Sequence, residues 1–374
     1  MIQQSRKAQN EAQIASFLHM KCGKKGIPLA GNFELTARCN FSCRMCYVHQ
    51  EEDREKELSA EEWIALGRTA KDNGMLFLLL TGGEPFLRAD FARIYTQLRK
   101  MGLMISINTN GSLLTDELME VFRQYPPTRV NVSLYGGSAQ TYRDLCRNAA
   151  YETVTANIRR MKEEGLSLKI NFSVTPYNVQ DIEKIFDFGK ENGIPVQATT
   201  YMYPPVRING EKYGIAPDRF SWEDAAKYMV LCREQYLTPE QLMHGITQTE
   251  EDTLDCTGET GMPMNCRAGR TAFWVTWDGR MLPCGMFPNE GYSVRSMKFE
   301  EAWQKVRDYT ASIMMPAECS GCSRREKCAA CAAACIAESG DSTIKPEYIC
   351  NMTQRQEDLI KQKYGRGIRS DENK

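Results

Sequence analysis

Residues 38–47 read RCNFSCRMCY and carry three cysteines, Cys39, Cys43 and Cys46, at C-x3-C-x2-C spacing. The stretch follows residues 33–37, an apolar run that predicts a short strand. Cysteine thiolates hold the irons of iron–sulfur clusters, with one thiolate per iron in the common cubane. Three ligands on one loop would leave one iron open to an outside ligand. The spacing therefore predicts a cluster that binds a further molecule.

The composition is that of a soluble, enzyme-sized protein. The chain has 374 residues, of which 42% are apolar and 25% charged, enough for one large core and a smaller one. A formal net charge of −1 argues against a dedicated nucleic-acid partner, which normally requires a basic face. With 3 histidines, a histidine-rich metal or acid–base site is not expected.

No segment predicts a membrane span or an export signal. The longest unbroken run of large apolar residues, residues 75–80, is far shorter than the roughly 20 residues that cross a bilayer. Residues 1–26 are polar and charged, without the apolar core of a signal peptide. We expect a cytoplasmic protein, in which 15 cysteines indicate metal ligands rather than disulfides.

Short apolar runs alternate with amphipathic segments over the first half of the chain. This pattern predicts a βα unit repeated about six times, hence a mostly parallel sheet with helices outside it. Strands are expected at residues 33–37, 76–81, 104–109, 129–134, 168–174 and 195–199. Helices are expected at residues 60–72, 89–101, 115–124, 149–164 and 179–192.

The rest of the chain is organised differently. Prolines and glycines between residues 204 and 217 interrupt the repeat, and residues 221–235 predict a bridging helix. From Cys256 to Cys350 regular periodicity gives way to cysteine spacing, and the charged tail after Gln354 predicts a terminal helix with a frayed end.

Further motifs follow three of the predicted strands, at the carboxyl ends where βα enzymes place their sites. Residues 81–85 read TGGEP, residues 108–111 read NTNG, and Ser133 ends the fourth strand. A lone C-x3-C-x2-C is also compatible with a zinc loop, and a lone GGEP with a tight turn. In this order and spacing, the set resembles the radical S-adenosylmethionine (SAM) superfamily. That resemblance implies an α/β fold built on a partial (β/α)6 TIM-like barrel.

The resemblance also implies a cofactor site. Cys39, Cys43 and Cys46 would hold a [4Fe–4S] cluster whose open iron chelates SAM. Small glycines would let the backbone approach SAM, and Glu84 would offer an anion to its ammonium group. Tyr47 would pack near adenine together with Met45, core packing being the alternative, and Arg143 or Arg147 would pair with the SAM carboxylate, surface exposure being the alternative. The expected SAM-binding residues are Tyr47, Gly82, Gly83, Glu84, Pro85, Asn108, Asn110, Ser133 and Arg147.

A second group of cysteines resembles the SPASM extension of radical SAM enzymes, which carries two auxiliary [4Fe–4S] clusters. The resemblance assigns Cys266, Cys284 and Cys331 to the first cluster. Cys256 is one candidate for its fourth ligand, and an open iron for substrate is the other. The second cluster would take Cys319, Cys322, Cys328 and Cys350.

Two alternatives remain open for these cysteines. The family usually has C-x3-C where this chain reads Cys328-x2-Cys331-x3-Cys335, so Cys331 and Cys335 compete for one position, and the distance to residues 340–341 favours Cys331. Zinc is the other metal for the region, because C-x2-C pairs also build zinc ribbons. Cys22, Cys146 and Cys232 lie outside the pattern, where a buried free thiol is expected.

These features divide the chain into five parts. We expect an N-terminal extension at 1–30, the radical SAM barrel at 31–215, a helical linker at 216–255, the SPASM domain at 256–352, and a charged tail at 353–374.

The resemblance predicts a radical SAM oxidoreductase that cleaves SAM to a 5′-deoxyadenosyl radical and oxidatively modifies a ribosomally made peptide, by a crosslink, a thioether or dehydrogenation, under anaerobic conditions. Gly285 and Thr81 stand where sulfatase-maturing relatives have aspartate and glutamine, which weighs against that substrate. One alternative is a radical SAM dehydrogenase acting on a small molecule or protein side chain. Another is an iron–sulfur electron carrier or a zinc-binding scaffold.

The expected partners follow from that chemistry. A reductant such as flavodoxin or ferredoxin would supply the electron. Only about thirty residues precede the first strand, too few for an independent leader-binding domain. A peptide leader would therefore bind to a separate protein or to the barrel rim.

Overall fold

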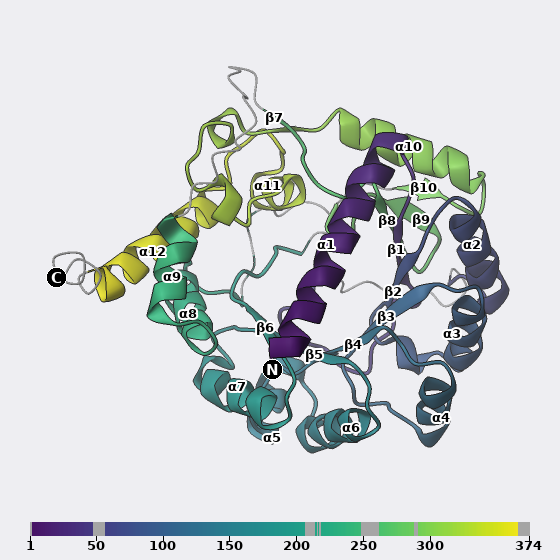
Figure 1. Ribbon diagram of the computed structural model, residues 1–374, viewed down its shortest axis with the longest axis horizontal. Coiled ribbons are helices and arrows are strands. Elements are labelled where there is room, and N and C mark those ends of the chain that lie inside the picture. The colour runs from purple at the N-terminus through teal and green to yellow at the C-terminus, as the bar shows by residue number, and fades with distance from the viewer. Residues whose placement is uncertain are drawn as a thin grey trace.

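The computed structural model describes residues 2–47, 57–205, 214, 216, 218–247, 262–287 and 291–365. Within these residues the strands form a nine-stranded sheet in the order β10-β9-β8-β1-β2-β3-β4-β5-β6, and β11 and β7 pair separately. Strands β1 to β6 are parallel and curve inside a ring of helices (Figure 1). The predicted parallel α/β barrel is confirmed. The six parallel strands are β1 (Ala30–Glu34), β2 (Phe77–Thr81), β3 (Met104–Thr109), β4 (Arg129–Ser133), β5 (Leu168–Ser173) and β6 (Val196–Thr199).

The first strand begins and ends earlier than predicted. It was expected at residues 33–37, whereas β1 runs from Ala30 to Glu34. Gly31 interrupts the apolar pattern at its start. An added Cβ on Gly31 would lie 2.5 Å from the Met75 sulfur and 2.9 Å from the Phe273 ring, so these side chains would have to shift. After Glu34 the chain leaves the ladder and turns into the cysteine loop.

Helices cover the outside of the curved sheet (Figure 1). Ser59 and Glu62 form a reciprocal capping box that fixes the start of α2, so this helix has the predicted limits. Thr115 and Ser138 cap α4 and α5 with their side chains. The barrel helices are α2 (Ala60–Asp72), α3 (Phe91–Lys100), α4 (Asp116–Gln124), α5 (Ala139–Cys146), α6 (Tyr151–Glu163) and α7 (Ile182–Glu191), with short 3-10 turns η2 (Pro85–Leu87) and η3 (Val179–Asp181).

Residues of each strand alternate between an apolar outer face and a polar inner face. In β3, Ile105 and Ile107 are fully buried, whereas Asn108 is only half-buried. In β5, Ile170 and Phe172 are buried while Asn171 between them is half-buried. Because successive side chains of a strand point to opposite faces, the helices cover the apolar set and the polar set lines the inside of the barrel.

The cysteine-rich part of the chain is continuous with the barrel. Strand β8 (Ala272–Val275) pairs in parallel with β1, so the sheet crosses the predicted limit between 31–215 and 256–352. Strands β9 (Arg280–Leu282) and β10 (Tyr292–Ser293) extend the same edge, and β7 (Met262–Pro263) pairs with β11 (Met314–Met315).

Aromatic side chains join the two parts on the outer face. Phe33 of β1 contacts Phe273 of β8, with ring centroids 6.4 Å apart, and Trp63 of α2 on its other side, at 5.0 Å. Phe273 then meets Phe299 and Trp303 of α10 (Phe299–Ala311) at 5.3 and 6.0 Å. Burying such large rings together makes β8 and α10 part of the barrel's own core.

The expectation that periodicity is lost between Cys256 and Cys350 is wrong for the described residues, because regular helices form there. Helix α10 has 13 residues and α11 (Ala332–Ser339) has 8. The terminal helix α12 (Glu347–Tyr364) starts before the predicted tail and contains Cys350. It packs beside α8 (Trp222–Glu234), where Lys363 pairs with Glu234 at 2.8 Å, and α9 (Pro239–Thr247) follows α8.

Helix α1 (Ile2–Lys25) lies at the amino ends of the strands, opposite the cysteine loop. His19 bonds to Thr271, just before β8, at 2.7 Å and stacks on Phe77, the first residue of β2. The predicted N-terminal extension is thus a helix that contacts this end of the barrel. Among the described residues, no helix is both long enough and apolar enough to cross a membrane.

Candidate functional site

The three cysteines of residues 38–47 line the wall of one cavity. Cys39, Cys43 and Cys46 are half-buried and open onto a cavity of about 610 Å³. The end of α5 holds the loop that carries them, because Ser42 donates its N–H to the Cys146 carbonyl at 3.2 Å and Arg44 donates to the Leu145 carbonyl at 3.0 Å.

The cavity wall combines the cysteine loop with residues from the carboxyl ends of five strands or from the loops just after them. Gly82 and Gly83 follow β2, Asn108 belongs to β3 and Asn110 follows it, and Ser133 ends β4. Of the predicted SAM-binding residues, the cavity is lined by Tyr47, Gly82, Gly83, Asn108, Asn110 and Ser133.

Sequence reasoning missed the wall contributed by the last two strands of the barrel. Asn171 and Ser173 of β5 and Thr199 of β6 line the cavity, as do Tyr201 and Tyr203 after β6. The alternation of polar and apolar residues in 168–173 carried the signal for Asn171 and Ser173. The tyrosines had no such signal, because their position depends on how the chain leaves β6.

Gly82 and Gly83 fit tightly against the chain that leads into the cysteine loop. Gly83 donates its N–H to the Thr36 carbonyl at 2.8 Å, and an added Cβ on Gly83 would lie 2.3 Å from the Arg38 carbonyl oxygen. Gly82 has a φ of +149° and its Cβ would lie 2.5 Å from the Thr36 oxygen. The glycines therefore permit this contact between two backbones, in addition to exposing backbone to the cavity.

The prediction for Glu84 needs correction. Its carboxylate is completely buried and points to the end of β3 rather than into the cavity. It accepts hydrogen bonds from the Asn110 N–H at 2.7 Å, the Thr109 hydroxyl at 2.8 Å and the Phe86 N–H at 3.0 Å. Because both oxygens are engaged, this carboxylate is a structural clamp and not a free anion for an ammonium group. Pro85 begins the buried turn η2 behind it.

Asn110 continues the clamp to the cysteine loop. Its Nδ2 donates to Asn40 Oδ1 at 2.8 Å and lies 3.9 Å from the Cys39 sulfur. Its Oδ1 accepts from the N–H and hydroxyl of Ser112 at 2.9 and 2.7 Å. The amide that was predicted to contact SAM is therefore used mainly to hold the loop next to Cys39.

Neither arginine predicted for the SAM carboxylate lies at the cavity. Arg143 is exposed and bonds to Gln140 on the same helix at 3.0 Å. Arg147 is exposed and takes the left-handed conformation, φ 53°, that ends α5. Neither side chain lines the cavity, and the pairing of an arginine with the SAM carboxylate stays a prediction.

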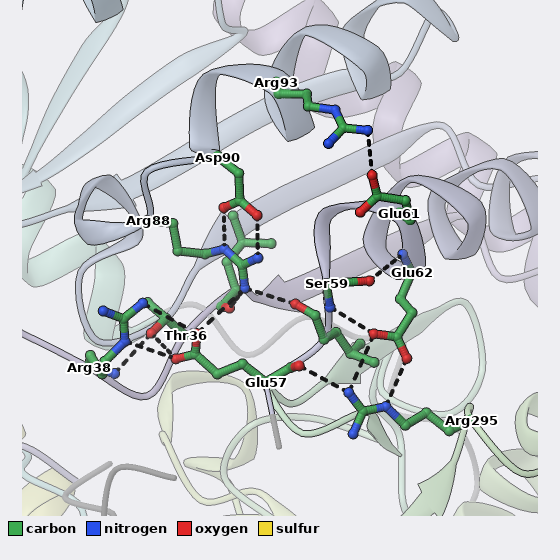
Figure 2. Close-up of polar contacts among 12 residues, drawn as sticks. Thr36, Arg38, Glu57, Ser59, Glu61, Glu62, Arg88, Asp90, Arg93 and Arg295 are labelled. Atoms are coloured by element: carbon green, nitrogen blue, oxygen red, sulfur yellow. Dashed lines mark hydrogen bonds and ion pairs between the residues drawn. The ribbon is translucent and has the colours of Figure 1, made fainter. Parts of the chain in front are cut away.

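A buried ionic network holds the two ends of the cysteine loop (Figure 2). Glu57 accepts from the Thr36 hydroxyl and from Arg38 Nε at 3.2 Å, and lies 3.7 Å from Arg88 Nη1. Arg88 also pairs with Asp90 at 2.8 Å and donates to the Leu35 and Leu58 carbonyls at 2.8 and 3.0 Å. The guanidinium of Arg88 thereby holds residues 35–38, which lead into the loop, next to residues 57 and 58.

The same network reaches the C-terminal region. Arg295, which follows β10, donates to Glu62 at 2.9 Å and to the Glu57 carbonyl at 3.0 Å (Figure 2). Glu62 closes the capping box of α2 with Ser59. The loop position, the start of α2 and the C-terminal region are consequently linked.

Several of the C-terminal cysteines influence one another electrostatically. Burial raises the pKa of Cys319, and Cys328 and Cys322 raise it further. Burial likewise raises the pKa of Cys350 to about 11, with the next contribution from Cys328. The assignment of Cys319, Cys322, Cys328 and Cys350 to one cluster stays a prediction. Cys256 lies outside the described residues.

Cys331 and Cys335 have different surroundings. Cys335 is completely buried in an apolar cluster with Met264 and Phe287. Cys331 is half-buried at the start of α11, and its sulfur lies 3.8 Å from the hydroxyl of Tyr203, a residue of the cavity wall. Burial raises the pKa of Tyr203, and Cys331 and Cys284 raise it further. Cys266, the other predicted member of this group, is exposed.

The cysteine surroundings fit iron–sulfur ligation. The backbone N–H two residues after the cysteine bonds to the sulfur of Cys39 at 3.4 Å, Cys266 at 3.5 Å, Cys284 at 3.3 Å and Cys328 at 3.4 Å. Such bonds favour a thiolate over a thiol. Soft, all-sulfur ligand sets select iron–sulfur clusters or zinc. A three-cysteine set on a cavity of this size suits a cluster with an open iron and a small-molecule ligand.

Comparisons with known proteins agree with this geometry. Residues 33–189 match the radical SAM superfamily. The AdoMet-dependent heme synthase of Methanosarcina barkeri is 28% identical over 337 residues, which cover 84% of this chain and 94% of that protein.

Two solved structures share the fold over most of the chain. The structure of Streptococcus suis SuiB bound to precursor peptide SuiA superposes with a TM-score of 0.67 at 19% identity, covering 91% of this chain and 81% of that one. Native anSMEcpe with bound AdoMet and Cp18Cys peptide gives a TM-score of 0.68 at 17% identity, covering 90% and 98%.

The buried carboxylate predicts a pH-dependent stability. Burial raises the pKa of Glu84 from 4.5 to about 7, although three hydrogen bonds act in the opposite direction. The folded state therefore binds more protons than the unfolded state between these values, and wild-type stability falls as pH rises across that window. The glutamine of Glu84→Gln cannot titrate, and its amide N–H group would face backbone donors. We therefore expect a lower free energy of unfolding than for wild type near pH 5, and a smaller difference between the two proteins near pH 8. Urea unfolding measures both proteins.

Glu117, an exposed residue of α4, provides the control for this pH series. Glu117→Gln should follow the wild-type profile at every pH. If the difference in free energy of unfolding between Glu84→Gln and wild type stays constant from pH 5 to pH 8, the titration cannot be assigned to Glu84.

Two glutamates that pair with arginine at different depths give a second prediction. Glu57→Ala removes a carboxylate that is 11% exposed, and charge-assisted bonds at that depth contribute about 2 kcal/mol. Glu61→Ala breaks an ion pair with Arg93 in which both side chains are more than half exposed, so solvent screens the pair and the loss of stability should be much smaller. Urea midpoints measure both losses, and equal losses would refute the role of Glu57 in anchoring the loop.

Proposed function

Residues 33–189 of this chain are a radical SAM domain, and we propose that the protein uses it to remove a hydrogen atom from a peptide side chain that is then oxidised. The observation that carries this proposal is a single cavity lined both by the three loop cysteines and by Tyr203, which contacts Cys331 of the second cysteine group. A [4Fe–4S] cluster with SAM in this cavity would supply a 5′-deoxyadenosyl radical after one-electron reduction.

The chain's own residues would orient SAM and exclude water. Gly82 and Gly83 present backbone to the cavity, while Asn108 and Ser133 offer neutral hydrogen-bonding groups. Tyr47 and Asn110 complete the proposed SAM site. Glu84 acts from behind by holding Asn110 in place.

We expect an oxidised product because the C-terminal cysteines would hold clusters that can accept an electron. A substrate that loses a hydrogen atom keeps an unpaired electron, and an oxidised product requires an acceptor for one electron. We assign Cys266, Cys284 and Cys331 to one auxiliary cluster and Cys319, Cys322, Cys328 and Cys350 to a second. The contact of Cys331 with the cavity wall supports Cys331 over the fully buried Cys335.

The cavity wall supports an uncharged substrate group. Its described residues are amides, hydroxyls, tyrosines, small residues and sulfur-containing residues, and none of them is a lysine, arginine or histidine. A peptide side chain fits such a wall. SuiB and anSMEcpe, which share the fold, were both solved with peptides bound, and this supports the same class of substrate here.

A tetrapyrrole is the second candidate substrate. The heme synthase of Methanosarcina barkeri matches this chain over 94% of its length, far beyond the barrel alone. A tetrapyrrole and a peptide side chain differ in the protein groups that must hold them. The carboxylates of a porphyrin would require cations, which the described wall does not place in the cavity.

The proposal retains three partners. These are a peptide substrate, a flavodoxin- or ferredoxin-type reductant, and a separate protein or the barrel rim as the site for a peptide leader.

Anaerobic reconstitution tests the cofactor assignment. We expect about twelve irons per chain, because three cubanes hold four irons each. Incubation with SAM and dithionite should release 5′-deoxyadenosine, measured by chromatography. The Cys39/Cys43/Cys46→Ala triple variant should lose this product and keep about eight irons. Bound zinc without SAM cleavage, or SAM cleavage by the triple variant, would refute the proposal.

Substrate candidates are compared with the same reconstituted protein. Peptides encoded by neighbouring short reading frames are expected to lose two hydrogens, measured by mass spectrometry. Iron-coproporphyrin III serves as the competing substrate and should remain unchanged. Its decarboxylation would replace the peptide by the second candidate.

A further inference from the structure

Tyr203 lines the cavity and also contacts Cys331, one of the C-terminal cysteines. It follows β6 and lines the cavity together with Cys39 and Cys46. Its hydroxyl lies 3.8 Å from the Cys331 sulfur, within hydrogen-bonding range for sulfur. One side chain thus contacts both the space where a substrate would react and a proposed ligand of the electron acceptor.

The Tyr203 hydroxyl is the hydrogen-bonding group that lies beside the Cys331 sulfur. Cys331 occupies the N-cap position of α11, yet its side chain accepts no capping hydrogen bond from the helix. Cys39, Cys266, Cys284 and Cys328 instead receive a backbone N–H bond from the residue two positions later. An iron-bound thiolate has no proton to donate, so a phenol beside it is the donor.

The position of Tyr203 is fixed by a set of contacts that spans both parts of the molecule. Its ring meets Tyr201 edge to face, with centroids 4.8 Å apart. Tyr201 donates to Glu338 of α11 at 2.7 Å, and the buried Arg219 binds the same carboxylate at 2.7 Å. Arg219 also lies 4.0 Å above the ring of Tyr348. A tyrosine held this way keeps its hydroxyl beside α11.

We propose that Tyr203 donates a hydrogen bond to the Cys331 sulfur and thereby raises the reduction potential of the iron–sulfur cluster that Cys331 holds. The inference rests on the proposed function, which assigns Cys331 to that cluster. Hydrogen bonds to ligand sulfurs are one of the protein's means of setting cluster potentials, because they stabilise the more negative reduced form.

The proposal gives Tyr203 a positioning role in the oxidation step. The substrate C–H bond breaks and its hydrogen atom passes to the 5′-deoxyadenosyl radical, which becomes 5′-deoxyadenosine. The substrate radical then gives one electron to the cluster at Cys331 and one proton to water, which completes the loss of two hydrogens. The Tyr203 hydroxyl keeps its proton throughout. A higher potential at this cluster makes it the better acceptor.

The test uses the full-length Cys39/Cys43/Cys46→Ala variant, which carries only the auxiliary clusters and so removes the overlapping signal of the SAM site. Tyr203→Phe is introduced into it, with Tyr201→Phe as the matched control that removes a neighbouring hydroxyl bonded to Glu338 instead of sulfur. Midpoint potentials are measured by redox titration monitored by electron paramagnetic resonance. We expect Tyr203→Phe to lower the potential of one cluster and leave the other unchanged, and Tyr201→Phe to shift neither.

The outcomes separate this inference from the proposed function. If the triple variant retains about eight irons but Tyr203→Phe leaves both potentials unchanged, the inference fails and the proposed function stands. If Tyr201→Phe shifts the same potential as much as Tyr203→Phe, packing rather than the hydrogen bond sets it, and the inference again fails. If the triple variant retains no iron, the auxiliary clusters and the inference fall together.

Discussion

The buried carboxylate of Glu84 is the constraint on which the geometry of the site depends. A buried carboxylate is costly unless its oxygens are satisfied. Here they accept bonds from Phe86, Thr109 and Asn110, which belong to the ends of two neighbouring strands. Asn110 in turn holds Asn40 in the cysteine loop. The position of the cysteines is therefore linked to the hydrogen bonds of one acid that follows the neighbouring strand β2, and moving the loop would disturb those bonds.

The features of the fold that could be predicted from the sequence are those fixed by residues close together in the chain. Helix α2 has both predicted limits because its start is fixed locally by Ser59 and Glu62. The pairing of β8 with β1 was not predictable, because it joins residues more than two hundred positions apart and β8 carries no motif. Tyr203 was not predicted for the same reason, because its partner Cys331 lies 128 positions later in the sequence, at the N-cap of α11.

At the site, sequence motifs gave positions but not orientations. The TGGEP motif placed Glu84 at the end of β2, yet the direction of its side chain depends on three donors from elsewhere in the barrel. Gly82 and Gly83 were expected to make room for a ligand, whereas their closest neighbours are the backbone atoms of Thr36 and Arg38. Arg147 was expected to face inward, but α5 ends at the residue before it.

The joint between the barrel and the C-terminal region explains why one cavity can serve both cysteine groups. Strand β8 completes the sheet edge beside β1, and Arg219 forms a buried ion pair with Glu338. A buried pair adds little net stability, since desolvation offsets its attraction, but it penalises any arrangement that separates the partners. These contacts therefore hold α11 and Cys331 in one place next to Tyr201 and Tyr203, the tyrosines that follow β6. If Cys331 holds an electron acceptor, as proposed, that acceptor would stay at one distance from the reacting carbon, which is the geometric condition for oxidation to outcompete return of the hydrogen atom.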